Sequence, residues 1–172
     1  MKHHLSVLLV AGSICFIVSC QKEKVMAPET ENKTNSVNAK MKESGVPFKG
    51  NYTTVAQFLK GPAVQKITGT GQATHLGQSV FVANATVNLT PPPPFAIAGT
   101  AVFTAANGDQ FYTRFPGTST PTGPGTSRGV LNHVITGGTG RFADATGSFT
   151  GIALVNNASP TNTVSFEGRI SY

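Results

Sequence analysis

Residues 137–151, GGTGRFADATGSFTG, combine a glycine-rich turn with the beginning of a strand. Glycine adopts positive φ angles at no steric cost, so the first three glycines are expected to form a tight turn. The phenylalanine would then cover one end of the fold, and the next strand would begin near the fourth glycine. The structural positions of this turn are Gly137, Gly138, Gly140, Phe142 and Gly147. A phosphate-binding loop is not indicated, because neither Lys-Ser/Thr nor a helical pattern follows the glycines.

Short runs of alternating apolar and polar residues surround this turn. Gly, Pro and Asn separate the runs, and no apolar pattern of helical period extends over the length of a helix. This pattern indicates an all-β fold. The expected strands cover residues 50–59, 65–76, 79–90, 95–105, 109–115, 128–136, 146–156 and 163–172.

The breaks between these runs fit antiparallel connections. Asn107-Gly108 is the strongest two-residue hairpin signal in the chain. Pro91–Pro94 cannot lie inside a sheet and are expected to form an exposed, stiff polyproline connection. A further break is expected over Pro116–Gly125, which is rich in Pro, Gly and Thr.

The last run alternates cleanly, with Val164, Phe166, Ile170 and Tyr172 on one face and polar residues on the other. Eight such strands with mostly short connections predict an eight-stranded antiparallel up-and-down β-barrel over residues 46–172, in which the last strand pairs with the first. The absence of Trp and of long lipid-facing bands argues against a transmembrane barrel.

The pattern Gly-Gly-Thr-Gly-x-Phe-x-x-Ala-x-Gly over residues 137–147 resembles the turn-and-strand motif of the allene oxide cyclase and dirigent barrel superfamily. Those proteins share an eight-stranded antiparallel barrel of comparable length, so the resemblance implies the same fold here. The cyclases use a carboxylate and a held water on an epoxide, and dirigent proteins use acidic and aromatic residues to steer radical coupling. No motif here matches those sites, so the resemblance carries over only the structural turn.

His75 and His133 are the candidate functional residues of this domain. Each is in phase with apolar neighbours in its expected strand, so each could point into the barrel and act as an acid, a base or a ligand group. The alternative is a rim histidine for His75 and a hydrogen-bonded core histidine for His133. Carboxylates are scarce in the domain, so no metal site and no cofactor are expected.

The N-terminus predicts export and lipid attachment. A short basic leader precedes an apolar run from Leu5 to Val18, whose length suits a signal peptide better than a transmembrane helix. The run ends in Ile17-Val18-Ser19-Cys20, which resembles the lipobox of bacterial lipoproteins. The resemblance implies that residues 1–19 are removed and that Cys20 carries a diacylglycerol and an N-acyl chain such as palmitate. The alternative is an ordinary secretory signal with an incidental cysteine.

Residues 20–45 are expected to be a lipidated, disordered tether, because they are polar, charged and without apolar periodicity. The residue after Cys20 is Gln21 rather than Asp, which favours the outer membrane of the cell envelope over the inner membrane. The other cysteine, Cys15, lies in the segment that is removed, so the mature chain would hold no free thiol and no disulfide. The net charge of +6 is scattered, which argues against nucleic acid as a partner.

These features predict a lipid-anchored envelope protein whose barrel has a binding, interaction or structural role. The expected partners are the membrane, through Cys20, and a small apolar ligand. The alternative is an enzyme of the cyclase or isomerase type that acts on a small apolar substrate in the barrel mouth. The interior of the barrel distinguishes these roles: a packed interior favours structure, and a cavity favours binding or catalysis.

Replacing the lipidated residue tests the anchor. Cys20→Ala should release the protein from membranes, because two or three acyl chains hold a protein firmly and none would remain. Detergent phase partitioning of cell extracts measures the change. Cys15→Ala is the control and should stay in the detergent phase, whereas equal partitioning of Cys20→Ala and the wild type would refute lipid anchoring.

Overall fold

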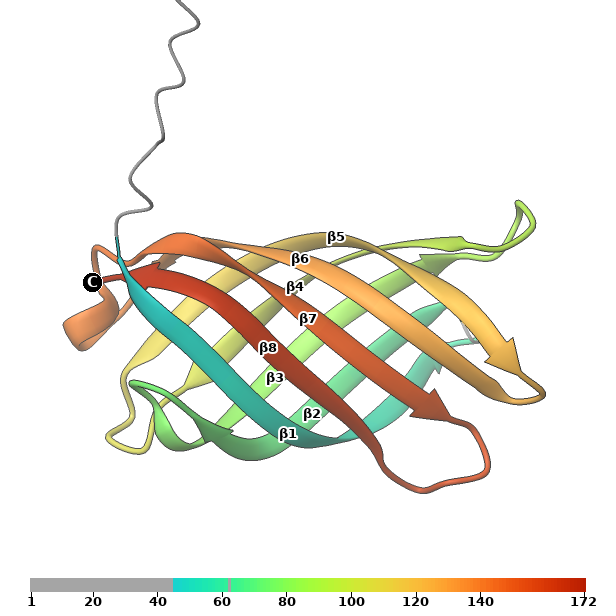
Figure 1. Ribbon diagram of the computed structural model, residues 1–172, viewed down its shortest axis with the longest axis horizontal. Coiled ribbons are helices and arrows are strands. Elements are labelled where there is room, and N and C mark those ends of the chain that lie inside the picture. Colours follow the sequence, from blue (N-terminus) through green and yellow to red (C-terminus); the bar gives the residue numbers. More distant parts are fainter. Residues whose placement is uncertain (1–44, 62) are drawn as a thin grey trace, which may run out of the picture. The chain divides into compact units, whose positions relative to one another are not determined.

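Eight strands in consecutive order form one closed antiparallel barrel in the computed structural model, which describes residues 45–61 and 63–172 (Figure 1). Among those residues the helical structure is limited to the single turn η1, Gly140–Phe142. No helix in this part of the chain has the length and apolar character to cross a membrane. The strands are β1 Val46–Lys60, β2 Val64–Ala73, β3 Gly77–Asn88, β4 Phe95–Thr104, β5 Gln110–Gly123, β6 Thr126–Gly138, β7 Thr146–Asn156 and β8 Asn162–Ser171.

The first and last strands close the barrel. Every residue of β1 from Val46 to Thr54 has an antiparallel partner in β8, from Ile170 back to Asn162. The sequence-based prediction of an eight-stranded up-and-down barrel is therefore confirmed. Closure matters physically because it removes the two unpaired strand edges that an open sheet of this order would expose.

The chain runs up and down, so its turns fall into two groups. We call the end with the turns at residues 74–76, 105–109 and 139–145 the closed end. The opposite end, with the connections at residues 89–94, 124–125 and 157–161, is the open end. Figure 1 shows that β1 begins, and the chain ends after β8, at the closed end beside η1.

One predicted break was wrong. Pro116–Gly125 was expected to separate two strands, but β5 continues through Pro116 to Gly123 and turns tightly into β6 at Pro124-Gly125. The pairing of β4 with β5 ends at Ser119, so the rest of β5 pairs with β6 alone. A proline such as Pro121 is tolerated there, because a strand with one free side does not need every N–H donor.

The other turn signals are confirmed. Asn107-Gly108 lies in the turn between β4 and β5, where Gly108 has a φ of 90°. Pro91–Pro94 are exposed and lie between β3 and β4, outside both strands. These residues form connections because their backbones require positive φ or lack an N–H donor.

The inner face of the barrel is packed with aromatic rings at the closed end. Phe48, Phe103 and Phe111 are fully buried, and the rings of Phe103 and Phe111 stack with their centroids 4.7 Å apart. Phe142 from η1 is also fully buried and contacts Phe111 edge-to-face at 5.6 Å. Burying a Phe side chain stabilises a fold by roughly 1.5–3 kcal/mol, so this cluster is a major source of stability.

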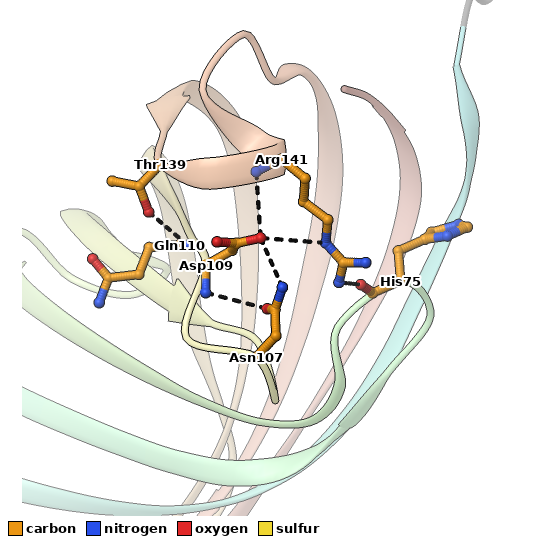
Figure 2. Close-up of polar contacts among 6 residues, drawn as sticks. All are labelled: His75, Asn107, Asp109, Gln110, Thr139 and Arg141. Atoms are coloured by element: carbon orange, nitrogen blue, oxygen red, sulfur yellow. Dashed lines mark hydrogen bonds and ion pairs between the residues drawn. The ribbon is translucent and has the colours of Figure 1, made fainter.

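A polar network joins the three turns of the closed end (Figure 2). The carboxylate of Asp109 accepts hydrogen bonds from the Asn107 side chain at 2.8 Å and from the backbone N–H of Arg141 at 3.3 Å. The guanidinium of Arg141 lies 3.9 Å from the same carboxylate and donates to the backbone carbonyl of His75. The hydroxyl of Thr139 accepts from the backbone N–H of Gln110 at 3.0 Å. The network therefore fixes η1 over the aromatic cluster.

Two glycines with the same backbone conformation give a matched stability test. Gly140 and Gly61 have φ angles of +55° and +56°, but a Cβ at Gly140 would overlap the Asp109 carboxylate, whereas a Cβ at Gly61 has no atom within 4 Å. Gly61→Ala should cost only the left-handed backbone strain, about 1 kcal/mol. Gly140→Ala should cost about 3 kcal/mol, because Asp109 must also move. Chemical denaturation measures both values, and equal losses would contradict this account of the turn.

Candidate functional site

The open half of the barrel encloses a cavity of about 650 Å³. This volume is within the range of roughly 300–1,000 Å³ that small-molecule sites occupy. Its wall is formed by inward-facing residues of β1 to β8 and by the β7–β8 connection. The cavity therefore lies inside the barrel, on the far side of the aromatic cluster from η1.

Small side chains create this space. Ala83 and Ala85 occupy successive inward positions of β3, and Gly129 of β6 and Ala153 of β7 also line the cavity. On β3, the inward residue on the closed-end side of these alanines is Phe81, which is 4% exposed and contacts Phe103 at 5.3 Å. The cavity begins where the inward side chains change from Phe to Ala and Gly.

The part of the cavity wall that the structure describes carries no charged side chain. Among the described residues that line it, none is Asp, Glu, Lys or Arg. Most of its surface is apolar, with Ile67, Ile97 and Leu131 among the lining residues. Polar groups gather at the rim, where the β7–β8 connection contributes Asn157 and Ser159. An interior of this kind suits an uncharged, largely apolar molecule.

His133 lines the inner part of the cavity from β6 and is 3% exposed. Its ring stacks on Phe149 at 4.9 Å with an interplanar angle of 8°, and it contacts Phe115 at 4.5 Å. Nδ1 lies 3.0 Å from the hydroxyl oxygen of Thr113, within hydrogen-bond distance. Nε2 is buried without a hydrogen-bond partner among the described residues. His133 thus faces inward, and it is the one titratable group in the described wall of the cavity.

Burial lowers the pKa of His133 from its ordinary value of 6.5 to about 3. The cause is desolvation, because the surrounding aromatic rings cannot solvate an imidazolium. The imidazole is therefore neutral at neutral pH. It contributes hydrogen-bonding groups to the cavity wall but no charge.

His75 does not reach the cavity. The expected strand 65–76 was too long, because β2 ends at Ala73 and His75 lies in the following turn with a φ of 65°. The inward phase of β2 therefore does not extend to it. Its Nε2 lies 3.1 Å from the carbonyl oxygen of Pro47, and its ring is 5.6 Å from that of Tyr172. Figure 2 shows His75 beside Arg141 at the closed end, so the structure does not bring the two candidate histidines together.

The glycine-rich turn lies at the closed end, away from the cavity. Gly137 and Gly138 end β6, Gly140 begins η1, and Gly147 lies at the start of β7. Three of these four glycines have positive φ angles, of 135° for Gly137, 55° for Gly140 and 129° for Gly147. These positive φ angles are those of a structural turn. Cys20 lies outside the described residues.

No protein-family model, curated protein or solved structure matches this chain. In residues 45–61 and 63–172, no three or more His, Cys, Asp and Glu side chains gather in a way that could hold a metal ion. The candidate site is therefore the cavity alone, defined by its shape and by the chemistry of its wall.

Sequence reasoning missed most of the cavity-lining residues and also Thr113. The signal was present in the alternation of β3, where Phe81, Ala83 and Ala85 share one face, and in the inward phase of Phe111, Thr113 and Phe115 in β5. Locating the cavity from this alternation requires the register between neighbouring strands. The pairing of the strands in the structure supplies the register, and the sequence of a single strand does not.

The lowered pKa of His133 predicts a pH-dependent stability. The unfolded chain binds a proton at this residue below about pH 6.5, while the folded chain does so only near pH 3, so His133 makes the fold less stable as the pH falls between these values. Between about pH 7.5 and 4.5 the loss from this group should be on the order of 2–3 kcal/mol. The test compares urea denaturation of the wild type and His133→Phe at both pH values, with His75→Phe as the control for loss of a histidine. Identical pH dependence of wild type and His133→Phe would contradict the assignment.

Proposed function

We propose that the protein is a lipid-anchored protein of the bacterial cell envelope whose barrel binds a small, uncharged apolar molecule in its cavity. The observation that carries the proposal is the cavity itself: about 650 Å³ with no charged side chain among its described lining residues. Apolar surface gains roughly 25 cal/mol for each Å² removed from water, so such a wall favours an apolar ligand over water.

The contrast between the two halves of the barrel supports binding over a purely structural role. At the closed end, inward positions hold Phe48, Phe103 and Phe111. These three side chains pack together and are 0% exposed. At the open end, several inward positions hold small residues, among them Ala83, Ala85, Gly129 and Ala153, and the interior is not filled. An unfilled apolar space costs stability, because its lining atoms lose contacts. A ligand would restore those contacts.

Binding is also better supported than a cyclase or isomerase reaction. Acid–base catalysis at neutral pH is most effective when the catalytic group has a pKa near 7. His133 is the one titratable side chain in the described cavity wall, and burial lowers its pKa to about 3. A neutral imidazole with so low a pKa is a weak base, and none of the described lining residues beside it is a carboxylate.

The proposed anchor is compatible with an accessible cavity. The barrel strand that follows the expected tether, β1, begins at the closed end, and the cavity opens at the other. The expected tether would therefore join the domain at the end away from the mouth. At roughly 25 residues it is long enough to let the mouth turn toward the membrane. The outer membrane is the proposed location because Gln21, rather than Asp, follows the lipidated cysteine.

Cavity filling tests the proposed function. The neutral fluorescent probe N-phenylnaphthylamine should bind the purified protein with increased emission. Ala85→Phe should weaken this binding at least about tenfold, because Ala85 is 6% exposed and lines the cavity, so a larger side chain occupies ligand volume. Thr86→Phe is the matched control, since Thr86 is the exposed neighbour on the outer face of β3.

Two outcomes would refute binding in the cavity. One is a wild-type protein that does not bind the probe. The other is an Ala85→Phe protein that retains its fold and binds as tightly as Thr86→Phe. The circular dichroism spectrum and thermal transition of each variant report whether the barrel is intact.

A further inference from the structure

The most exposed apolar side chains in the described part of the chain gather toward the open end. Four large apolar residues are more than half exposed: Val55 at 52%, Phe58 at 59%, Leu59 at 55% and Leu154 at 55%. All four lie in the parts of β1 and β7 that lead to the open end (Figure 1). Leu89, which follows β3 at the same end, is 42% exposed. Exposed apolar groups that gather at one end of a fold are candidates for an interaction site.

Cationic side chains stand among these apolar ones. Lys60 ends β1, Lys66 lies near the start of β2, Arg128 lies near the start of β6, and all three are exposed. No ion pair within the described residues involves any of them. The acidic side chains of the described residues lie away from these three cations. Asp109 and Asp144 lie in the closed-end turns, and Glu167 pairs with Lys49 at 2.9 Å.

One cation and one apolar group are direct neighbours across a ladder: Arg128 of β6 is the register partner of Leu154 of β7. At the end of β1, the apolar residues Phe58 and Leu59 are followed by Lys60. Such neighbours suit the surface of an anionic bilayer. Apolar side chains enter the boundary of the acyl chains, while the long Lys and Arg side chains keep their charges at the phosphates.

We propose that the open end of the barrel docks on an anionic lipid bilayer. The rim that makes the contact consists of Phe58, Leu59, Lys60, Lys66, Leu89, Arg128 and Leu154. The docking rests on these surface residues and does not depend on ligand binding.

A second copy of the chain is a poorer occupant of this surface. A symmetric pair of open ends would bring the same patch of each copy together. Both rims carry the cations Lys60, Lys66 and Arg128, so the contact would bring positive charges of the two copies close together, and like charges at an interface oppose association. An anionic surface removes this repulsion.

Docking in this orientation connects the bilayer with the proposed binding site. Phe58 and Leu89 belong to the rim and also line the cavity. An apolar molecule dissolved in the bilayer would therefore reach the cavity without crossing water. The proposed ligand class follows from the same arrangement: a neutral membrane-soluble molecule.

Vesicle co-sedimentation tests the docking. The chain of residues 20–172 with Cys20→Ala, which lacks the lipid, should bind vesicles of phosphatidylglycerol and phosphatidylethanolamine at low salt. It should bind phosphatidylcholine vesicles at least about tenfold more weakly. Leu59→Ser with Leu154→Ser should reduce binding to the anionic vesicles about tenfold. These two leucines are outside the cavity wall, so binding of N-phenylnaphthylamine should persist.

Matched substitutions elsewhere on the barrel are the controls. Val46→Ser with Val134→Ser removes two apolar side chains, 41% and 38% exposed, nearer the closed end, and should leave vesicle binding unchanged. For the charges, Lys60→Gln with Arg128→Gln should weaken binding and reduce its salt dependence. Arg114→Gln with Lys49→Gln, a double change away from the open end, should have a much smaller effect.

Three results would overturn the proposal. They are equal binding to both kinds of vesicle, equal loss in the rim and control variants, and a rim variant that changes the oligomeric state measured by sedimentation while vesicle binding is unchanged. Each result leaves the proposed ligand binding intact if the probe still enters the cavity. Loss of probe binding with retained vesicle docking would instead refute the proposed function and leave this inference standing.

Discussion

The hydrogen-bonded ladder between β1 and β8 is the constraint on which the rest of the molecule depends. It pairs Val46 through Thr54 with β8 and makes the sheet continuous around the barrel. Once the sheet is closed, alternate residues of every strand must face a shared interior of limited volume. The sizes of those residues then decide whether the interior is packed or hollow at each level.

The interior of the barrel is packed at the closed end and hollow at the open end. The closed end is packed with aromatic rings and covered by η1, which the contacts of Asp109 and Arg141 hold in place. The open end lacks such filling, and Ala83 and Ala85 leave room there. The dense half supplies apolar burial that the hollow half does not. The cavity is therefore compatible with a stable fold, because the fully buried rings of Phe48, Phe103 and Phe111 lie outside its wall.

The fold could be predicted largely from local patterns. The alternation of Val164, Phe166 and Ile170 and the Asn107-Gly108 turn depend on short-range chemistry that a sequence displays directly, and both are confirmed. The break at Pro116–Gly125 was predicted wrongly, because composition does not reveal that the end of β5 has a partner on one side only.

The candidate site was harder to predict. The inward phase of His133 is visible in the sequence, and the structure places its ring against Phe115 and Phe149. The same argument failed for His75, because its strand ends two residues earlier and the chain turns with a positive φ. The cavity depends on the stacking of small residues from several strands at one level of the barrel. That alignment is set by register, which no single strand encodes.

The position of the barrel's two chain ends has a consequence for its engineering. Val46 is the register partner of Ile170, so the start of β1 and the end of β8 are adjacent. A short peptide could join them, and the chain could be reopened at the exposed prolines between β3 and β4. Such a circular permutant would keep the same ladders while moving both termini to the mouth. An affinity tag or a surface attachment would then obstruct the cavity instead of leaving it free, which would turn access to the interior into an adjustable property of the scaffold.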